Sequence, residues 1–222
     1  MVNTRYKIEQ KQFSIFVEMK CLCYFFVFPL LCLMFTSCNK PVTKQELTTY
    51  LNDPDNGLKQ EVKIGSYKIS LTYRPTDLLV EQDLFGDTTV ETIEAKRTEY
   101  NAYYYFILNM SLGENDVLYK GSTNQLQFSA SLNKLNFGLS EYIYAIADEK
   151  DTINLADYYV PNLYGMGGTT QILLVFPKDI SIIYEELEVT VKELGFGTGQ
   201  QKFKFKIKDM NNVPELKLLN AT

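Results

Sequence analysis

Cysteine is the most reactive residue type in this chain, and its positions limit the chemistry that it can support. All the cysteines lie near the amino terminus of a 222-residue chain that contains no histidine: Cys21, Cys23, Cys32 and Cys38. A disulfide framework or a zinc site needs cysteines that a folded domain can present, and all but the last lie inside an apolar run. The residues after Cys38 therefore offer neither a thiol nucleophile nor an imidazole acid–base group.

The glycine-rich stretch 195–199 (Gly-Phe-Gly-Thr-Gly) is the string that most resembles a phosphate-binding loop. Such a loop leads into a helix and carries a Lys-Ser or Lys-Thr pair, whereas Gln200 and Gln201 follow here. We therefore predict a hairpin loop, and the same for the glycines of 165–168. The stretch 53–57 (Asp-Pro-Asp-Asn-Gly) lacks the ligand spacing of a calcium loop, so we predict a rigid turn and no metal site.

Pairs of carboxylates could support glycosidase chemistry, which needs one carboxyl group with a raised pKa beside one that stays ionised. Acidic residues are available, but nothing in their spacing pairs them: Asp83, Glu91, Glu141 and Asp157. The chain also lacks tryptophan, which offers a sugar ring the largest aromatic surface. We therefore predict that the protein is not an enzyme and uses no cofactor.

Tyrosine is abundant, with 16 residues, and it combines a large apolar face with a hydroxyl group that suits interfaces. Successive side chains on a strand point to opposite faces, so the three tyrosines of 103–105 cannot share one patch and are assigned to the core. A recognition loop is expected over 159–168, beside a proline and a glycine cluster. Its candidate ligand-binding residues are Tyr158, Tyr159 and Tyr164.

The composition is that of an ordinary globular protein, with 45% hydrophobic and 22% charged residues and a net charge of −5. Residues 1–37 hold four basic and two acidic residues, so 18 basic and 25 acidic residues remain after them, a net charge of −7. Nucleic acid requires clustered Lys and Arg against its phosphates. We therefore predict no nucleic-acid partner.

Residues 19–37 have the layout of a secretory signal peptide. Met19 and a lysine precede the mostly apolar run 21–35, and small residues end it. A membrane-spanning helix needs about 20 apolar residues, and this run is shorter and contains Pro29. Residues 1–18 fit no part of a signal peptide, so we predict that Met19 is the true start; an extended positively charged region is the alternative.

The end of this leader, Phe35-Thr36-Ser37-Cys38, resembles the lipobox of bacterial lipoproteins. In that family the bond before the cysteine is cut, the thiol receives a diacylglycerol, and the new amino terminus is often acylated. The resemblance implies that Cys38 is the lipidation site and the first residue of the mature chain, although the family prefers leucine where Phe35 stands. Two or three acyl chains hold a protein on a membrane far more firmly than one.

Several features are similar to small uncharacterised lipoproteins of the Bacteroidota. They are a leader rich in cysteine and phenylalanine, a Ser-Cys-Asn-Lys junction at 37–40, a body rich in Tyr, Asn and Lys, and short patches at 56–75 and 163–167. The resemblance implies a lipid anchor in the outer membrane and brings no activity. Surface-exported members often carry an acidic patch after the cysteine, so the basic to neutral stretch 39–44 implies a protein that faces the periplasm.

Hydrophobic periodicity predicts a hairpin and a central strand. Apolar and polar residues alternate over 67–73, and a Gly-Ser turn joins this stretch to 58–64. The run 103–112 is apolar or aromatic at nearly every position, as expected for a strand buried on both faces. Further strands are expected at 141–147, 152–159, 171–176, 187–192 and 202–207. Lysines on the outer face of the last one predict an exposed edge.

Helical spacing is confined to short stretches between these strands. One helix is expected at 76–84, capped by Thr76 or Asp77, and a second, exposed helix at 90–99. One further element of undefined type is expected at 126–132. We predict a mainly β fold, an immunoglobulin-like β-sandwich of about seven or eight strands with one or two short helices, preceded by a signal peptide.

The domain organisation follows from these assignments. The parts are an upstream extension over 1–18, the lipoprotein signal peptide over 19–37, a polar tether over 38–56 in which 44–51 can be helical, and one β-rich domain over 57–222. The leading hypothesis is a non-enzymatic lipoprotein that serves as an accessory or scaffold of an envelope assembly, with an envelope protein as its partner. The alternatives are a glycan- or ligand-binding module and a fimbrial component that pairs sheet edges between chains.

Overall fold

The computed structural model describes residues 40–84, 86, 89–161, 168–179 and 181–218. From Pro41 onward they belong to one compact unit. The predictions for the signal peptide, Cys38 and Tyr164 lie outside the described residues. Within the described ranges no helix combines the length and the apolar character needed to cross a bilayer. The described residues form ten strands and six α-helices, more of both than predicted.

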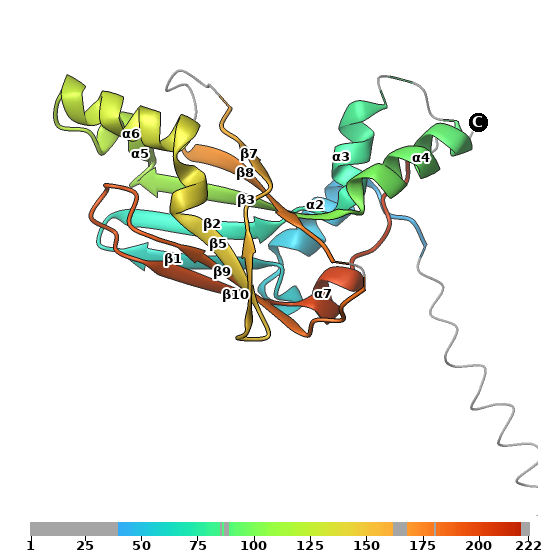
Figure 1. Ribbon diagram of the computed structural model, residues 1–222. Coiled ribbons are helices and arrows are strands. Elements are labelled where there is room, and N and C mark those ends of the chain that lie inside the picture. Colours follow the sequence, from blue (N-terminus) through green and yellow to red (C-terminus); the bar gives the residue numbers. More distant parts are fainter. Residues whose placement is uncertain (1–39, 85, 87–88, 162–167, 180, 219–222) are drawn as a thin grey trace, which may run out of the picture. The chain divides into compact units, whose positions relative to one another are not determined.

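The larger sheet has six strands, all paired antiparallel (Figure 1). They are β1 (Lys59–Ile64), β2 (Tyr67–Tyr73), β3 (Tyr103–Leu112), β8 (Thr170–Pro177) and β7 (Asp157–Tyr159) in that order, with β4 (Asn115–Asp116) paired to β3. The predicted hairpin is confirmed as β1 and β2. The predicted central strand is confirmed as β3, which lies between β2 and β8.

The smaller sheet has four antiparallel strands in the order β10 (Gln201–Lys206), β9 (Glu186–Val191), β5 (Ile143–Ala147) and β6 (Asp151–Asn154). The prediction for the last strand is confirmed, because β10 is an edge strand whose Phe203 and Phe205 are buried. Its lysines point outward, and Lys202 forms an ion pair of 2.7 Å with Glu188 on β9.

The prediction of one strand over 152–159 is wrong. This stretch forms β6 and β7, which belong to different sheets, and the chain crosses between them at Leu155 and Ala156. The crossing is fixed by a hydrogen bond of 2.9 Å from the Ala156 N–H to the carbonyl of Val175 on β8. Alternation along a strand does not indicate which sheet the strand joins, and this split contributes to the higher strand count.

One hydrophobic core lies between the two sheets. Phe106 of β3 and Phe205 of β10 meet there with ring centroids 4.9 Å apart, and Phe176 of β8 packs edge-on against Phe106. At one edge the sheets are also joined by the side-chain amide of Gln60 on β1. Its oxygen accepts a bond of 3.1 Å from the Lys204 N–H, and its nitrogen donates to the carbonyl of the same residue.

The predicted tether over 38–56 is folded from Pro41 onward. Helix α2 (Lys44–Asn52) buries Leu47 and Leu51 against the core, and the 3₁₀ turn η2 (Pro54–Asn56) follows it. Thr43 and Glu46 close the start of α2 with a capping box. Two buried leucines one helical turn apart indicate a helix that packs on the core. The prediction of a tether relied on the polar composition of the whole stretch and missed this spacing.

Helices α3 (Thr76–Asp83) and α4 (Val90–Tyr100) confirm the two predicted helices, but the predicted cap is wrong. Pro75 stands at the N-cap of α3 without a side-chain hydrogen bond, and Asp77 lies inside the first turn. The remaining helices are α5 (Val117–Lys120), α6 (Gln125–Phe137), the 3₁₀ helix η3 (Leu139–Glu141) and α7 (Ile207–Asn211). The element of undefined type at 126–132 is therefore part of α6.

Thr190 on β9 is fully buried, and its hydroxyl has no hydrogen-bond partner among the described residues. We expect Thr190→Val to raise the free energy of unfolding by about 1 kcal/mol, because a buried polar group without a partner is costly. The matched control is Thr170→Val, which removes a buried hydroxyl bonded at 2.8 Å to Asp116 and should destabilise by a similar amount. Denaturant titrations measure the unfolding free energy of both variants. A change in the same direction for the two variants would contradict this prediction.

Candidate functional site

Of the predicted ligand-binding tyrosines, Tyr158 and Tyr159 do not share a face of the sheet. Tyr158 and Tyr159 are neighbours on β7 and point to opposite faces of the sheet. Tyr158 is half-buried and donates a hydrogen bond of 3.0 Å to the carbonyl of Asn136 at the end of α6. Tyr159 is 63% exposed, and Tyr164 lies outside the described residues. Of the run assigned to the core, Tyr104 and Tyr105 are buried whereas Tyr103 is 38% exposed.

A polar hollow of about 410 Å³ lies on the larger sheet, on the face turned away from Phe106. We call it the sheet hollow. It is lined by Lys59, Lys68, Ser70, Asn109, Ser111, Gly113, Glu114, Gly168 and Thr169. The strand register places the lining residues, because Ser70 of β2 stands opposite Asn109 of β3, and Lys68 stands opposite Ser111. Its size falls in the range of small-molecule sites.

Two serines distinguish the sheet hollow from an ordinary polar surface. Ser70 and Ser111 are each only 5% exposed, yet neither hydroxyl has a hydrogen bond to any described residue. Both residues line the hollow, and neither hydroxyl oxygen is among the fully enclosed polar atoms without a partner in the described residues. Both hydroxyls are therefore open to the hollow and free to bond to water or to a ligand there.

The charged groups in and beside the sheet hollow balance each other, with two lysines in the lining against Glu114 in the lining and Glu61 beside it. Lys68 forms an ion pair of 2.9 Å with Glu61, and the Lys59 ammonium donates a bond of 2.8 Å to the Asn52 side chain. The side-chain amide oxygen of Asn109 accepts a bond of 3.1 Å from the side-chain amide of Gln171. Both lysines are thus engaged by oxygen atoms of the protein.

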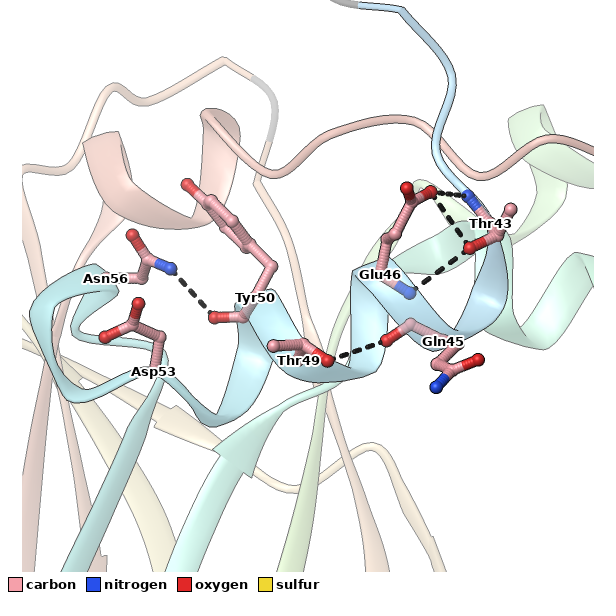
Figure 2. A pocket seen from close by; sticks show the side chains of 7 residues that line it. All are labelled: Thr43, Gln45, Glu46, Thr49, Tyr50, Asp53 and Asn56. Atoms are coloured by element: carbon pink, nitrogen blue, oxygen red, sulfur yellow. Dashed lines mark hydrogen bonds between the residues drawn. The ribbon is translucent and has the colours of Figure 1, made fainter.

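A second hollow, of about 540 Å³, lies along α2 (Figure 2). It is lined by Thr43, Gln45, Glu46, Thr49, Tyr50, Asp53 and Asn56. Most of its polar groups bond to each other, as in the 2.9 Å bond from the Asn56 amide to the Tyr50 carbonyl. The N–H and hydroxyl of Thr43 hold the pKa of Glu46 below its usual value. These bonds serve the helix and the turn, so we regard this hollow as structural.

The predicted rigid turn at 53–57 is confirmed. The Asp53 carboxylate accepts a bond of 3.0 Å from the Asp55 N–H, and Gly57 ends the turn with φ of 65°, a conformation that favours glycine. Within the described ranges, no group of three or more acidic or cysteine side chains is placed to hold a metal ion.

The glycine-rich stretch 195–199 is confirmed as the loop between β9 and β10. Its backbone N–H groups converge on one acceptor, the carboxylate of Glu193. One carboxylate oxygen lies 2.6, 2.7 and 3.0 Å from the nitrogens of Gly195, Phe196 and Gly197, and the other accepts from Gly199. The loop is therefore an anion-binding nest whose anion is part of the chain.

Glu193 should make stability depend on pH. Burial alone raises its pKa, but the four N–H bonds outweigh burial and hold the pKa below the ordinary value. The stabilisation is therefore complete above the unfolded pKa of about 4.3 and is lost as pH falls through the lower folded pKa. We expect Glu193→Gln to cost about 1–2 kcal/mol at neutral pH, since the loop is partly exposed. Denaturant titrations should show that the difference in unfolding free energy between the wild-type protein and the variant shrinks in acid. A difference that is constant across pH would contradict this role.

The carboxylates considered for glycosidase chemistry come from separate elements, α3, α4, η3 and β7. Asp83 accepts a bond of 2.6 Å from the Tyr100 hydroxyl and pairs with Lys96 at 3.0 Å, and both lower its pKa. A general acid requires the opposite shift. A Ser-x-x-Lys string runs from Ser131 to Lys134 on α6. Its lysine ammonium rests 4.6 Å from the centre of the Tyr142 ring.

Comparisons with known proteins identify no family. No family model matches the chain, and no curated protein matches it. A solved structure with some likeness is that of a novel protein of unknown function from Burkholderia pseudomallei. The likeness covers 80% of this chain and 96% of that chain, with 10% identity and a TM-score of 0.37. At these values it has no bearing on fold or function.

Proposed function

We propose that the protein is a non-enzymatic envelope lipoprotein whose folded domain is held directly at the membrane by lipid on Cys38. It serves there as an accessory or scaffold component, in the outer membrane and facing the periplasm. The observation that carries the proposal is the start of the fold at Pro41. Only Asn39 and Lys40 separate that residue from the lipobox cysteine.

The length of this connection has a physical consequence. Three residue steps span at most about 11 Å, so a lipid on Cys38 would keep Pro41 close to the bilayer surface. The residue that follows Pro41 is already part of the fold, because Val42 pairs with Leu216 in a parallel bridge. Its N–H donates a bond of 2.8 Å to the Glu215 carbonyl, and its carbonyl accepts one of 2.8 Å from the Lys217 N–H. A domain attached in this way has little freedom to search for distant partners.

The chemistry of the described residues supports a non-enzymatic role. The carboxylate Asp83 is held ionised by Tyr100 and Lys96, and the Glu193 carboxylate is committed to the loop 195–199. The immunoglobulin-like topology of the sandwich stays a prediction.

A second candidate function, a ligand-binding module, is favoured by the sheet hollow with its buried serines. The fimbrial alternative has less support. It needs open sheet edges, but the edge strands β1 and β10 are joined to each other by the Gln60 amide, and the edge strands β6 and β7 have only four and three residues.

The anchor is tested by feeding labelled palmitate to cells that express the full chain. We expect the label in the wild-type protein and its loss in Cys38→Ala, together with retention of the uncleaved leader. The matched control replaces Cys21, Cys23 and Cys32 by alanine and should keep the label, because the leader is removed. Label retained in Cys38→Ala, or absent from the wild-type protein, would overturn the proposal.

A further inference from the structure

We propose that the sheet hollow is a binding site for a polyhydroxylated ligand, a saccharide. The inference deepens the second candidate function and does not depend on the lipid anchor. It starts from Ser70 and Ser111, which are 95% buried as residues and line the hollow, and whose hydroxyls open into it without a hydrogen bond to any described residue. They stand diagonally on neighbouring strands, because Ser70 is opposite Asn109 and Ser111 is opposite Lys68. Together these side chains offer hydrogen-bond donors and acceptors on one face of the sheet.

The mixture of groups indicates the class of ligand. A serine hydroxyl both donates and accepts, the Asn109 amide still has its N–H hydrogens to donate, and the Glu114 carboxylate only accepts. A ligand that satisfies all of them needs many groups that can donate and accept, which is the property of sugar hydroxyls. A phosphate or a sulfate offers few or no donors and would be repelled by the Glu114 carboxylate, and one of the two lysines is already paired with Glu61.

The shape of the hollow agrees with this class. Gly113 lies at its rim with φ of 62°, and a Cβ there would have no atom within 4 Å, so this rim is open. The same face continues across the sheet to Tyr159, because Tyr159 stands opposite Leu173 and Gln171 stands opposite Asn109. The exposed ring of Tyr159 therefore lies on the same face as the hollow, where a longer saccharide can extend along it.

The test is saturation-transfer NMR on the full chain in detergent, with glucose, N-acetylglucosamine and glucuronate as probes. Each probe is used at about 10 mM, because open polar sites hold ligands at millimolar dissociation constants. We expect at least one sugar to receive saturation from the wild-type protein. The double variant Ser70→Ala/Ser111→Ala should weaken its binding by about tenfold or more, since two hydrogen bonds are lost and each is worth about threefold to tenfold in affinity.

Two further variants separate binding from folding. Glu114→Gln changes an exposed residue of the rim and should lower the affinity without lowering stability. Ser140→Ala changes an exposed serine away from the hollow and should bind like the wild-type protein. The Cys38→Ala variant should also bind, so failure of the anchor and failure of this inference are distinguishable. Saturation of none of the sugars, saturation unchanged in the double variant, or binding of inorganic phosphate alone would overturn the inference.

Discussion

Phe106→Ala is expected to lower the free energy of unfolding by about 4 kcal/mol, the largest effect of any single change considered. Phe106 is fully buried on the central strand β3, and its ring contacts aromatic rings from both sheets. Truncation removes the burial of a large ring and leaves a cavity that the two sheets cannot close without moving. Because a domain is stable by only about 5–15 kcal/mol, the variant should unfold at much lower denaturant concentration.

The control for Phe106 is the same substitution at an exposed position. Phe137 at the end of α6 is 81% exposed, so Phe137→Ala should change stability by no more than about 0.5 kcal/mol. Guanidinium titrations of both variants, followed by circular dichroism, provide the comparison. Equal losses for the two variants would mean that the sheets do not meet at Phe106.

Asp77→Ala should cost about 3 kcal/mol, because one carboxylate holds three parts of the chain together. Its two oxygens accept bonds of 2.8 and 3.0 Å from the guanidinium of Arg97 on α4. One of them also accepts a bond of 2.8 Å from the Leu216 N–H. The side chains of Asp77 and Arg97 are 12% and 27% exposed. Removing Asp77 leaves the partly buried Arg97 with only the exposed Glu94 and Glu215 as partners, and it leaves the Leu216 N–H without its acceptor.

The Asp77 prediction has a local and a global readout. Chemical denaturation measures the loss of stability, and hydrogen exchange should show faster exchange at Val42 and Lys217, whose N–H groups bond across the paired terminal segments. The matched control is Glu94→Ala, which removes an exposed partner of the same Arg97 at 3.1 Å and should cost at most about 0.5 kcal/mol. A loss as large as that of Asp77→Ala would show that net charge, and not the buried bonds, governs the effect.

Some elements could be predicted from the sequence. In these elements, apolar and polar residues alternate or a long stretch is apolar throughout. Apolar and polar residues alternate from Tyr67 to Tyr73, so this stretch by itself predicts a strand with one buried face. The apolar run 103–112 indicates a strand with neighbours on both sides. The loop at 195–199 was also predictable, because alternating stretches flank it. Its acceptor was not, since nothing in the sequence indicates that the Glu193 side chain turns back onto the loop.

The remaining features depend on contacts between distant residues. Thr152 and Tyr158 lie in one predicted strand but in different sheets, because Thr152 pairs with β5 and Tyr158 pairs with β8. Ser70 and Ser111 look like ordinary outward-facing serines in the sequence, because their burial is set by neighbours on other strands. Aspartate is a common helix cap, so Asp77 was a reasonable choice for the start of the helix. Its carboxylate bonds to Arg97, 20 residues later, and does not cap the helix.

The pairing of Val42 with Leu216 brings the entry and the exit of the domain together. A short peptide could therefore join these two segments, and the chain could be reopened at an exposed turn such as the one that contains Glu149. Such a circular permutant would retain every pairing of both sheets while moving the free ends to another part of the surface. The order of the strands along the chain is then a separate property from their order in space.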